Sequence, residues 1–226
     1  MTAALLITAC AGAPVKPPSA VERSRVLEKL AAANPPFNSM RMSGRAEFAP
    51  RMKQPSSKAS VALKRPAKLK AMFHDAFGTA WFLLVVNEES VFYTEPKDGA
   101  PTLVERKLGV PIKLGPLKIV PEDVIENLYP SFDPAGLAAA SLEFSGKKLS
   151  AKWAGLTKKW EFDGEWRIIS AVIKRDDGLV KFSYAYGTEA LTVSINSEIS
   201  FVFNWVEKGG EIADGLFLPP PQINND

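Results

Sequence analysis

The chain has 226 residues, of which 46% are hydrophobic and 23% charged, and its formal net charge is +3. Folding of a chain this long buries roughly 70% of its accessible surface, which allows one substantial core. One cysteine excludes an internal disulfide, and one histidine excludes most zinc sites and leaves only His74 for a serine–histidine–acid triad. We therefore expect neither catalysis nor a metal or cofactor. The longest apolar run after the N-terminus, residues 76–86, is too short for a transmembrane helix.

The first predicted element is a signal for export and lipidation. A short apolar run leads to Cys10, with Ile7 three positions before the cysteine and alanine on both sides of it. This arrangement resembles the lipobox of bacterial lipoproteins, in which the cysteine sulfur carries a diacylglycerol and further acylation gives stable anchoring. The resemblance implies that residues 1–9 are the remainder of a signal peptide, that Cys10 is lipidated and that the proline-rich residues 10–19 are a tether. The alternative is an unmodified cysteine in an apolar tail.

A helix and a series of strands follow the tether. Residues 19–22 have the spacing of a capping box and predict a helix over residues 20–33 that ends at two prolines. Residues 81–86 are apolar on both faces and predict a strand that is covered on both sides. Apolar and polar residues alternate in three further segments, which predicts half-buried strands at residues 40–48, 58–64 and 68–74.

The sequence of the second half of the chain predicts a helical interruption followed by further strands of the same sheet. Residues 97–136 break the alternation, and Pro121 opens a short helix within them. Alternation resumes near Leu142 and continues through hairpin-spaced turns to Trp205. Because a long twisted sheet curls, we predict an α+β fold, a curved and incompletely closed antiparallel β-barrel of about 11 strands with a helical lid. The domain spans residues 20–221, and we expect a monomer.

Positive charge is concentrated in one region. Residues 41–70 hold nine basic residues and one acid, which leaves 19 basic and 24 acidic residues elsewhere. A solvated sheet face that prevents edge pairing is one interpretation, and a contact with anionic lipid headgroups is another. No aromatic stacking pattern interleaves the basic residues, so a nucleic-acid partner is disfavoured. The candidates for anionic lipid contact are Lys64, Arg65, Lys68 and Lys70.

The combined features resemble a known family. The lipobox, the tether, one helix, a first group of strands, a helical insert and a closing meander resemble the LolB-like group of outer-membrane lipoproteins, within the LolA/LolB lipoprotein-localisation superfamily. The similarity is strongest in residues 63–82, which run from Leu63-Lys64-Arg65-Pro66 through Phe77-Gly78 to Trp81-Phe82. The first strand, residues 39–46, and the end of the chain, residues 216–221, resemble the family too.

That resemblance implies a function and a membrane-facing loop. It implies an unclosed barrel whose apolar cavity accepts the acyl chains of lipoproteins in transit, in a lipid-anchored protein of the outer membrane that faces the periplasm. The implied partners are outer-membrane lipid, lipoprotein acyl chains and a periplasmic lipoprotein carrier. In LolB-like proteins an apolar side chain in the loop after the third strand protrudes and helps insert the cargo. Residues 74–79 form that loop here, so Phe77 is the candidate, and a Phe77 folded back on the core is the alternative.

The cavity wall is predicted from rows of apolar residues, which occupy alternate positions along the predicted strands. A packed core is the first interpretation of such rows, but a large barrel can leave a ligand cavity of ~300–1,000 Å³. Methionines in the first strand suit an adaptable wall, because thioether side chains repack around flexible ligands. The candidate lining residues are Met40, Met42, Phe73, Trp81, Leu83, Trp153, Trp160, Phe182, Tyr184, Phe201 and Phe203.

Three hypotheses for function follow. The favoured one is a lipid-anchored carrier that receives or transfers lipoproteins or lipids to the outer membrane. The second is a non-catalytic envelope scaffold that binds a protein partner through the same fold without lipid. A hydrolase is the third, and it requires His74 to lie in a pocket near a serine. His74 and Asp75 are neighbours near a strand end, so their side chains point to opposite faces and do not form an oriented pair directly.

Overall fold

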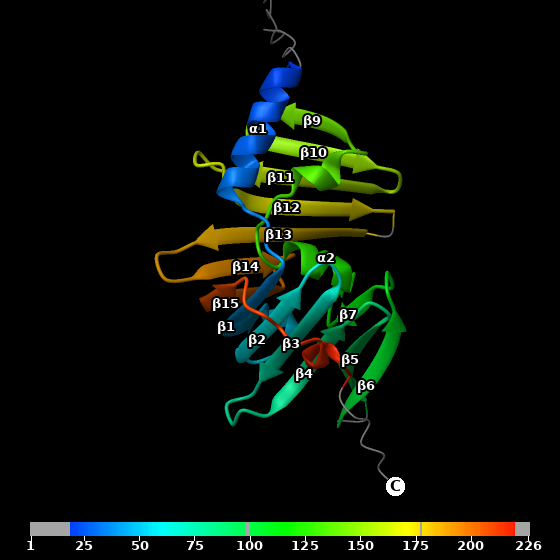
Figure 1. The fold of residues 1–226 in the computed structure, drawn as a ribbon. Coiled ribbons are helices and arrows are strands. Elements are labelled where there is room, and N and C mark those ends of the chain that lie inside the picture. Colours follow the sequence, from blue (N-terminus) through cyan, green and yellow to red (C-terminus); the bar gives the residue numbers. More distant parts are fainter. Residues whose placement is uncertain (1–18, 98–99, 177, 220–226) are drawn as a thin grey trace, which may run out of the picture.

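The computed structural model describes residues 19–97, 100–176 and 178–219, and these residues form one long antiparallel sheet with two α-helices (Figure 1). The signal segment, Cys10 and most of the tether lie outside the described residues. The helices are α1 (Ala20–Ala33) and α2 (Pro121–Asn127), and the 3-10 helices are η1 (Pro50–Met52), η2 (Pro134–Leu137) and η3 (Asp214–Phe217). The thirteen strands of the large sheet are β1 (Ser39–Phe48), β2 (Ser57–Lys64), β3 (Lys68–His74), β4 (Ala80–Val86), β5 (Ser90–Lys97), β6 (Ala100–Lys107), β9 (Ser141–Ser145), β10 (Lys148–Trp153), β11 (Leu156–Phe162), β12 (Ile168–Arg175), β13 (Gly178–Tyr186), β14 (Leu191–Ile195) and β15 (Ile199–Lys208).

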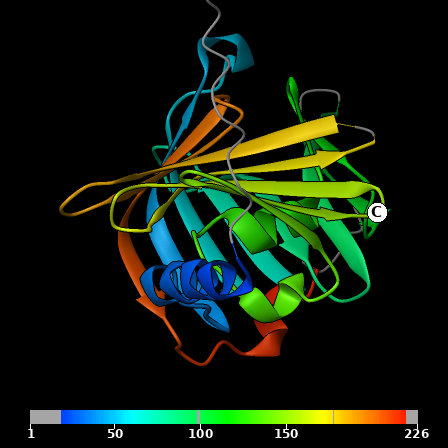
Figure 2. The same cartoon turned by 90° about the horizontal axis from the view of Figure 1, so that it is seen from above.

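The sheet curls around its own inner face but does not close. Its order is β6-β5-β4-β3-β2-β1-β15-β14-β13-β12-β11-β10-β9, so the first and last strands pair in the middle and β6 and β9 are the free edges. The chain between these edges carries the hairpin β7–β8 (Ile112–Leu114 and Leu117–Ile119), α2 and η2. Figure 2 shows α2 inside the curved sheet, which confirms the predicted open barrel with helices at its mouth.

Both α-helices begin where the sequence predicts. The Ser19 side chain accepts a hydrogen bond from the Glu22 amide, and Glu22 accepts one from the Ser19 amide, which completes the capping box of α1. At the other end of α1, the buried Asn34 side chain donates to the Trp166 carbonyl and accepts from the Ile168 amide. These bonds fix the end of α1 to the start of β12, and in Figure 1 the helix crosses β9 to β12.

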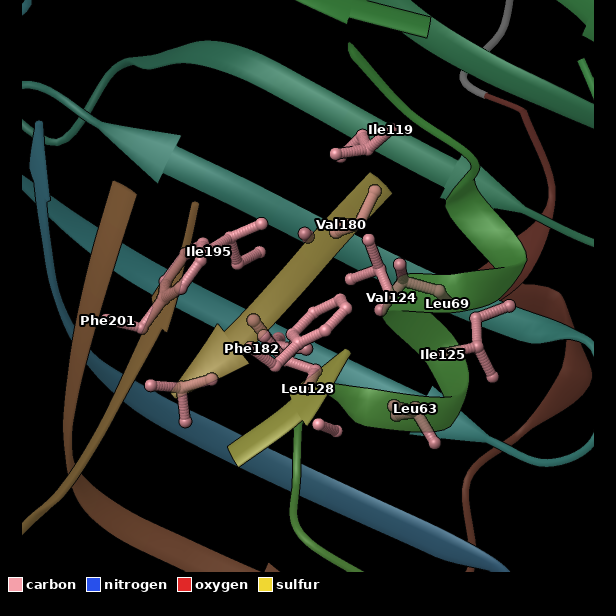
Figure 3. Close-up of a cluster of buried hydrophobic side chains, with 14 of the residues drawn as sticks. Leu63, Leu69, Ile119, Val124, Ile125, Leu128, Val180, Phe182, Ile195 and Phe201 are labelled. Carbon is pink, nitrogen blue, oxygen red and sulfur yellow. The ribbon is translucent and has the colours of Figure 1, made fainter. Parts of the chain in front are cut away.

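The middle of the barrel is a packed core built around α2. Val124, Ile125 and Leu128 are buried on the inner side of the helix, as its apolar spacing predicts. Figure 3 shows them among side chains of β2, β3 and β13 to β15, including Phe182 and Phe201. Burial of such apolar area at about 25 cal/mol per Å² is the main stabilising term of the fold. This core fills the middle of the barrel and therefore separates one end of its interior from the other.

A close contact between β1 and β15 sets the bend of the sheet. The register of the two strands shifts between Ser43 and Gly44, where a β-bulge interrupts the pairing. A Cβ atom on Gly44 would lie 2.0 Å from the Val202 carbonyl oxygen, far inside van der Waals contact. Only glycine allows the two backbones to approach this closely, so the curvature of the sheet requires glycine at this position.

Some sequence predictions needed correction. Strand β6 lies within residues 97–136, where we expected no sheet strand, and the large sheet has thirteen strands instead of about 11. As an edge strand with Pro101 and many exposed charges, β6 lacks the alternation of a half-buried strand. Between β11 and β12 the chain makes a turn in which Trp166 has φ 67°, and β12 begins at Ile168.

The outer face of the sheet is also partly covered. Ala62 of β2 packs with Ile212 and Phe217 of the C-terminal segment, and all three are buried. Val85 of β4 is fully buried and belongs to the same cross-strand row as Ala62, which agrees with the prediction that β4 is covered on both sides. Within the described ranges, no helix has both the length and the apolar character needed to cross a bilayer.

Candidate functional site

An apolar cavity of about 310 Å³ lies at one end of the interior, where the sheet opens between β4 and β5. These two strands pair only over Leu84–Val86 and Val91–Tyr93, and beyond that point the Leu83 amide donates to the Thr94 side chain instead of a backbone carbonyl. The cavity is lined by Phe48, Met52, Gln54, Phe73, Trp81, Phe82, Thr94, Glu95, Pro101, Lys113, Leu114, Gly115 and Ile199. A volume near the lower limit for small-molecule sites fits one narrow apolar segment.

Aromatic side chains from three strands build the inner wall of this cavity. The register of β3 and β4 shifts between Phe73 and His74, which leaves Trp81 in a bulge. The Phe73 ring stacks on Phe82 at 4.8 Å and lies 5.6 Å from both Phe48 and Trp81. The Trp81 indole donates to the buried Ser57 hydroxyl over 3.0 Å, so its ring is held in place while its apolar face lines the cavity.

The hairpin β7–β8 forms the opposite wall. Leu114 and Gly115 of its turn line the cavity, and Gly115 has φ +60°, which the tight turn requires. A Cβ at Gly115 would lie 3.4 Å from the Met52 terminal methyl, so the turn touches η1 across the cavity mouth. The hairpin pairs with no strand of the large sheet, and this makes it the wall whose displacement breaks the fewest hydrogen bonds.

An aromatic side chain protrudes beside this cavity. Phe77 is 95% exposed, in the loop between Phe73 and Trp81 of the cavity wall. The Asp75 carboxylate accepts hydrogen bonds from the amides of Phe77 and Thr79, both at 2.9 Å, and Gly78 has φ +85°. The loop backbone is therefore ordered by an Asx-type turn, and the side chain at its tip points away from the core. Phe77 is not folded back.

The predicted lining residues divide into four groups. Phe73 and Trp81 line the apolar cavity, and Trp153 and Trp160 line a second cavity described below. Leu83 is a correction, because strand alternation places it on the face opposite to the buried Phe82 and Leu84. The remaining six line neither cavity and belong to the packed core, because α2 fills the middle of the barrel: Met40, Met42, Phe182, Tyr184, Phe201 and Phe203.

The second cavity, of about 500 Å³, lies at the other end of the interior, by the turn between β2 and β3. Its apolar side is formed by Phe132, Leu137, Trp153, Leu156 and Trp160, and its polar side includes Arg65, Glu126, Asp133 and Lys158. Sequence reasoning missed Lys158. The signal was present, because alternation in β11 places this lysine on the inner face between Leu156 and Trp160, in a row of apolar residues.

The two cations of this cavity are poorly solvated. The Lys158 side chain is 14% exposed, lies over the Trp160 ring at 5.2 Å and pairs with Glu126 at 3.2 Å. Arg65 lies 4.0 Å over the Phe37 ring and donates to the Glu126 carbonyl, while its Nε atom is buried without a described partner. Burial lowers the pKa of both Lys158 and Arg65, because desolvation disfavours the charged form. Asp123 and Arg175 form a separate ion pair nearby.

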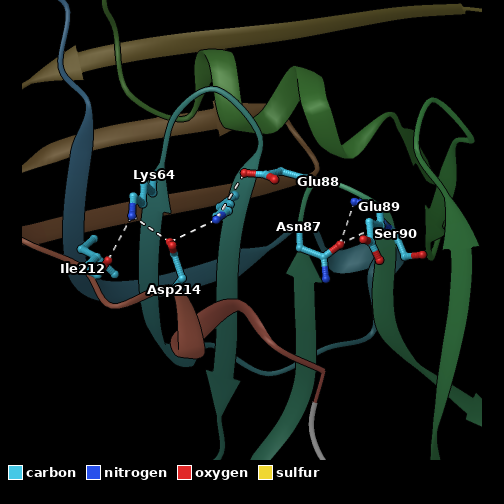
Figure 4. A network of polar contacts seen from close by, with 8 residues as sticks. Lys64, Asn87, Glu88, Glu89, Ser90, Ile212 and Asp214 are labelled. Carbon is cyan, nitrogen blue, oxygen red and sulfur yellow. Dashed lines mark hydrogen bonds and ion pairs between the residues drawn. The ribbon is translucent and has the colours of Figure 1, made fainter.

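The basic residues predicted to contact anionic lipid do not form one open patch. Asp214 of η3 accepts from Lys64 at 2.7 Å and from Lys68 at 3.0 Å, and Lys68 also pairs with Glu88 at 3.3 Å (Figure 4). These hydrogen bonds lower the pKa of Asp214. Arg65 turns toward the second cavity, and neither Arg65 nor Lys70 has an ion pair among the described residues. The C-terminal segment thus neutralises two of the four candidates.

His74 lies on the outer, basic face of the sheet. Its Nε2 atom is 3.4 Å from the Ser60 hydroxyl, within a shallow groove that Arg45 and Lys58 also line. Its Nδ1 atom faces the Gly78 carbonyl at 3.2 Å, so no carboxylate orients the ring as in a triad. Asp75 instead binds loop amides, as its neighbouring position predicts. We assign this pair no catalytic role. Among residues 19–97, 100–176 and 178–219, no group of three or more potential metal ligands occurs.

These features define an open antiparallel half-barrel with a helical plug and an apolar cavity at its open end. No family model matches the chain, and no curated protein sequence matches it. A solved domain from Vibrio parahaemolyticus, described as an outer-membrane lipoprotein-sorting domain, is similar with a TM-score of 0.52 and 10% identity over 85% of this chain and 94% of that one. A LolA superfamily protein from Nitrosomonas europaea gives a TM-score of 0.44 and 12% identity over 87% and 97%. The chain has a LolA/LolB-like fold, as predicted from its sequence.

Proposed function

We propose that the protein is a lipid-anchored carrier that binds acyl chains and receives or transfers lipoproteins or lipids at the periplasmic side of the outer membrane. One observation supports this most directly: the apolar cavity opens between β4 and β5 beside the exposed Phe77. Its wall is mostly aromatic and aliphatic, so an acyl chain that enters it leaves water, at about 25 cal/mol per Å² of buried apolar area. The fold shared with the Vibrio lipoprotein-sorting domain supports the same class of function.

The size of the cavity sets what it holds without rearrangement. About 310 Å³ fits part of one chain, and the packed core around α2 blocks access to the rest of the interior. A lipoprotein with several acyl chains therefore requires the β7–β8 hairpin and α2 to move outward. The exposed Phe77 would enter the membrane surface at the same end, and Cys10 with its tether would hold the domain near that surface.

Uptake of an acyl chain tests the proposal. Protein that begins after Cys10 is titrated with a brominated monoacylglycerol, which has an uncharged head and quenches indole fluorescence at short range. We expect saturable quenching near one chain per protein, and we expect Trp81→Phe to remove most of it. Trp205→Phe is the matched control, because Trp205 is 49% exposed and lies outside the cavity. Saturating ligand with no quenching contradicts the proposal and favours the protein-binding scaffold.

Transfer to vesicles tests the role of Phe77. We expect Phe77→Ser to leave chain uptake unchanged and to slow delivery of the chain to vesicles several-fold, since the exposed ring buries apolar area only at a membrane. Val21→Ser, at another exposed apolar position, is the control. Equal delivery rates for Phe77→Ser and the unmodified protein would overturn this role.

A further inference from the structure

The cationic cavity next to α2 is the strongest feature that the acyl-chain proposal does not use. Two half-buried cations, Arg65 and Lys158, lie on either side of Glu126, whose side chain is 62% exposed. Lys158 pairs with the Glu126 carboxylate, while Arg65 reaches only the Glu126 carbonyl with one guanidinium nitrogen and leaves its Nε unpartnered. Arg65 therefore makes no ion pair among the described residues, and the one carboxylate that pairs with Lys158 is open to solvent.

An apolar surface adjoins these charges. Trp153, Leu156 and Trp160 line one side of the cavity, and Phe132 packs edge-on against Trp160 with ring centres 5.6 Å apart. Exposed residues such as Pro66 and Gly136 form its rim, so the cavity opens to solvent. A ligand that fits both parts has an anionic group for the two cations and an apolar tail for the aromatic wall.

We propose that this second cavity binds the anionic head of an acyl amphiphile, with the phosphate or carboxylate between Arg65 and Lys158 and the tail along Trp153, Leu156 and Trp160. The Glu126 carboxylate occupies the anion position in the free protein, and the ligand's head displaces it from Lys158. Glu126 is the partner that can move, because it lies at the solvent-exposed side of α2 near the end of the helix. The proposal rests on acyl-chain binding as the general function and adds that the protein discriminates lipids by head charge.

The other carboxylates around the cavity make no ion pair with Arg65 or Lys158 among the described residues. Asp123 is committed to Arg175 through two hydrogen bonds, and the Asp133 side chain caps η2 by accepting from the Ala135 amide. Tyr184 is buried beside the cavity and donates to the Asn127 carbonyl, which leaves its hydroxyl uncharged. Lys159, the next residue on β11, is exposed on the outer face and serves as a control for charge alone.

A matched pair of lipids tests the proposal. Lyso-phosphatidic acid and a monoacylglycerol of the same chain length differ only in the phosphate, and inorganic phosphate supplies the head without the tail. We expect the unmodified protein to bind lyso-phosphatidic acid at least about tenfold more tightly than the monoacylglycerol, because a desolvated charge-assisted contact strengthens the first alone. Inorganic phosphate is expected to bind far more weakly, since the apolar contacts are missing.

Three variants separate recognition from folding. Lys158→Met is expected to abolish the preference for the anionic lipid, Lys159→Met to retain it, and Glu126→Gln to increase it by removing the competing carboxylate. A purely structural role for Lys158 predicts no opposite effect of the Glu126 variant. If Lys158→Met fails to fold, the Glu126→Gln result still decides. Equal affinity for both lipids in the unmodified protein, or inorganic phosphate bound as tightly as the lipid, overturns the proposal. Failure of all acyl ligands to bind contradicts the proposed function itself, whereas equal binding of both lipids leaves that function intact.

Discussion

The two ends of the barrel interior differ in the chemistry of their walls, although both belong to one continuous sheet. Strands β2 and β3 run from the apolar cavity, at Phe73, to the cationic cavity, at the turn that contains Arg65. At the first end, aromatic side chains stack on one another and no ion pair lies among them. At the second end, two half-buried cations lie beside a solvent-exposed carboxylate, and Arg65 makes no ion pair among the described residues. The comparison teaches that one curved sheet can hold an unspecific apolar site and a charge-selective site, separated by the core around α2.

The largest effect is expected from a substitution that disturbs the bend of the sheet, which both ends of the interior share. Gly44→Ala places a methyl group against the Val202 carbonyl, only 2.0 Å from its oxygen, so β1 and β15 cannot keep their present approach. We expect a loss of more than about 3 kcal/mol in the free energy of unfolding, or no folded protein, measured by chemical denaturation. Gly136→Ala is the control, since nothing lies within 4 Å of its Cβ position. Similar stability of the two variants would show that the bend does not depend on Gly44.

The next largest effect is expected from a substitution that fills only the apolar cavity. Leu114→Trp adds a bulky ring from the β7–β8 turn into the space between Phe48 and Trp81. We expect monoacylglycerol uptake to weaken by about tenfold, which corresponds to ~1.4 kcal/mol, while lyso-phosphatidic acid binding at the other end stays unchanged. Quenching titrations with both ligands measure this, and Val21→Trp on the exposed side of α1 controls for the added indole. Loss of both activities would mean that the two cavities act as one site.

The cationic cavity is expected to reduce the stability of the empty protein. The charge on Lys158 is desolvated, and replacing it by an apolar group of similar size removes that cost, so Lys158→Met should raise the free energy of unfolding by about 1–3 kcal/mol. Lys159→Met should change it little, because that side chain is exposed. Urea denaturation of both variants measures the difference. A destabilised Lys158→Met would show that the Glu126 pair outweighs the desolvation of the lysine.

The difference in unfolding free energy between Lys158→Met and the unmodified protein is expected to depend on pH. Because the folded-state pKa of Lys158 lies below its ordinary value of 10.5, the folded protein holds this proton less tightly than the unfolded chain does. The stability advantage of Lys158→Met is therefore full below the lowered pKa and shrinks as the pH rises through it toward 10.5. The facing groups do not reverse this trend, since Asp123 and Arg65 keep their charges there and burial raises the pKa of Tyr184 well above its usual value. A constant difference across that range would assign the stabilisation to packing alone.

The smallest expected effect concerns the outer face between the two ends. Asp214→Asn releases Lys64 and Lys68 from their shared carboxylate, and exposed pairs of this kind add little stability. We expect no measurable change in the unfolding midpoint and a modest, salt-sensitive rise in binding to anionic vesicles. Flotation of the protein with vesicles at two salt concentrations measures it. Unchanged vesicle binding would mean that these lysines do not contact lipid headgroups.

Local patterns in the sequence predicted much of the fold. The capping box of Ser19 and Glu22 located α1, and period-two alternation located most strands, because both signals depend on neighbours close in sequence. Strand β6 was not predicted because an edge strand needs no apolar face and therefore shows no alternation. The sequence selected Phe77 as the loop residue to inspect, but only the structure shows that its side chain is exposed.

The sequence alone determined which residues are apolar, where the strands turn and that one long sheet must curl around a helical insert. Only the tertiary structure decided that α2 fills the middle of the barrel, which turned most of the predicted lining residues into core and left a cavity at each end. It also decided that Asp214 neutralises two lysines from about 150 residues away and that Arg65 and Lys158 meet at Glu126. The physical reason is range. Alternation and capping are interactions between near neighbours, whereas a cavity and its charge balance depend on side chains that only the folded chain brings together.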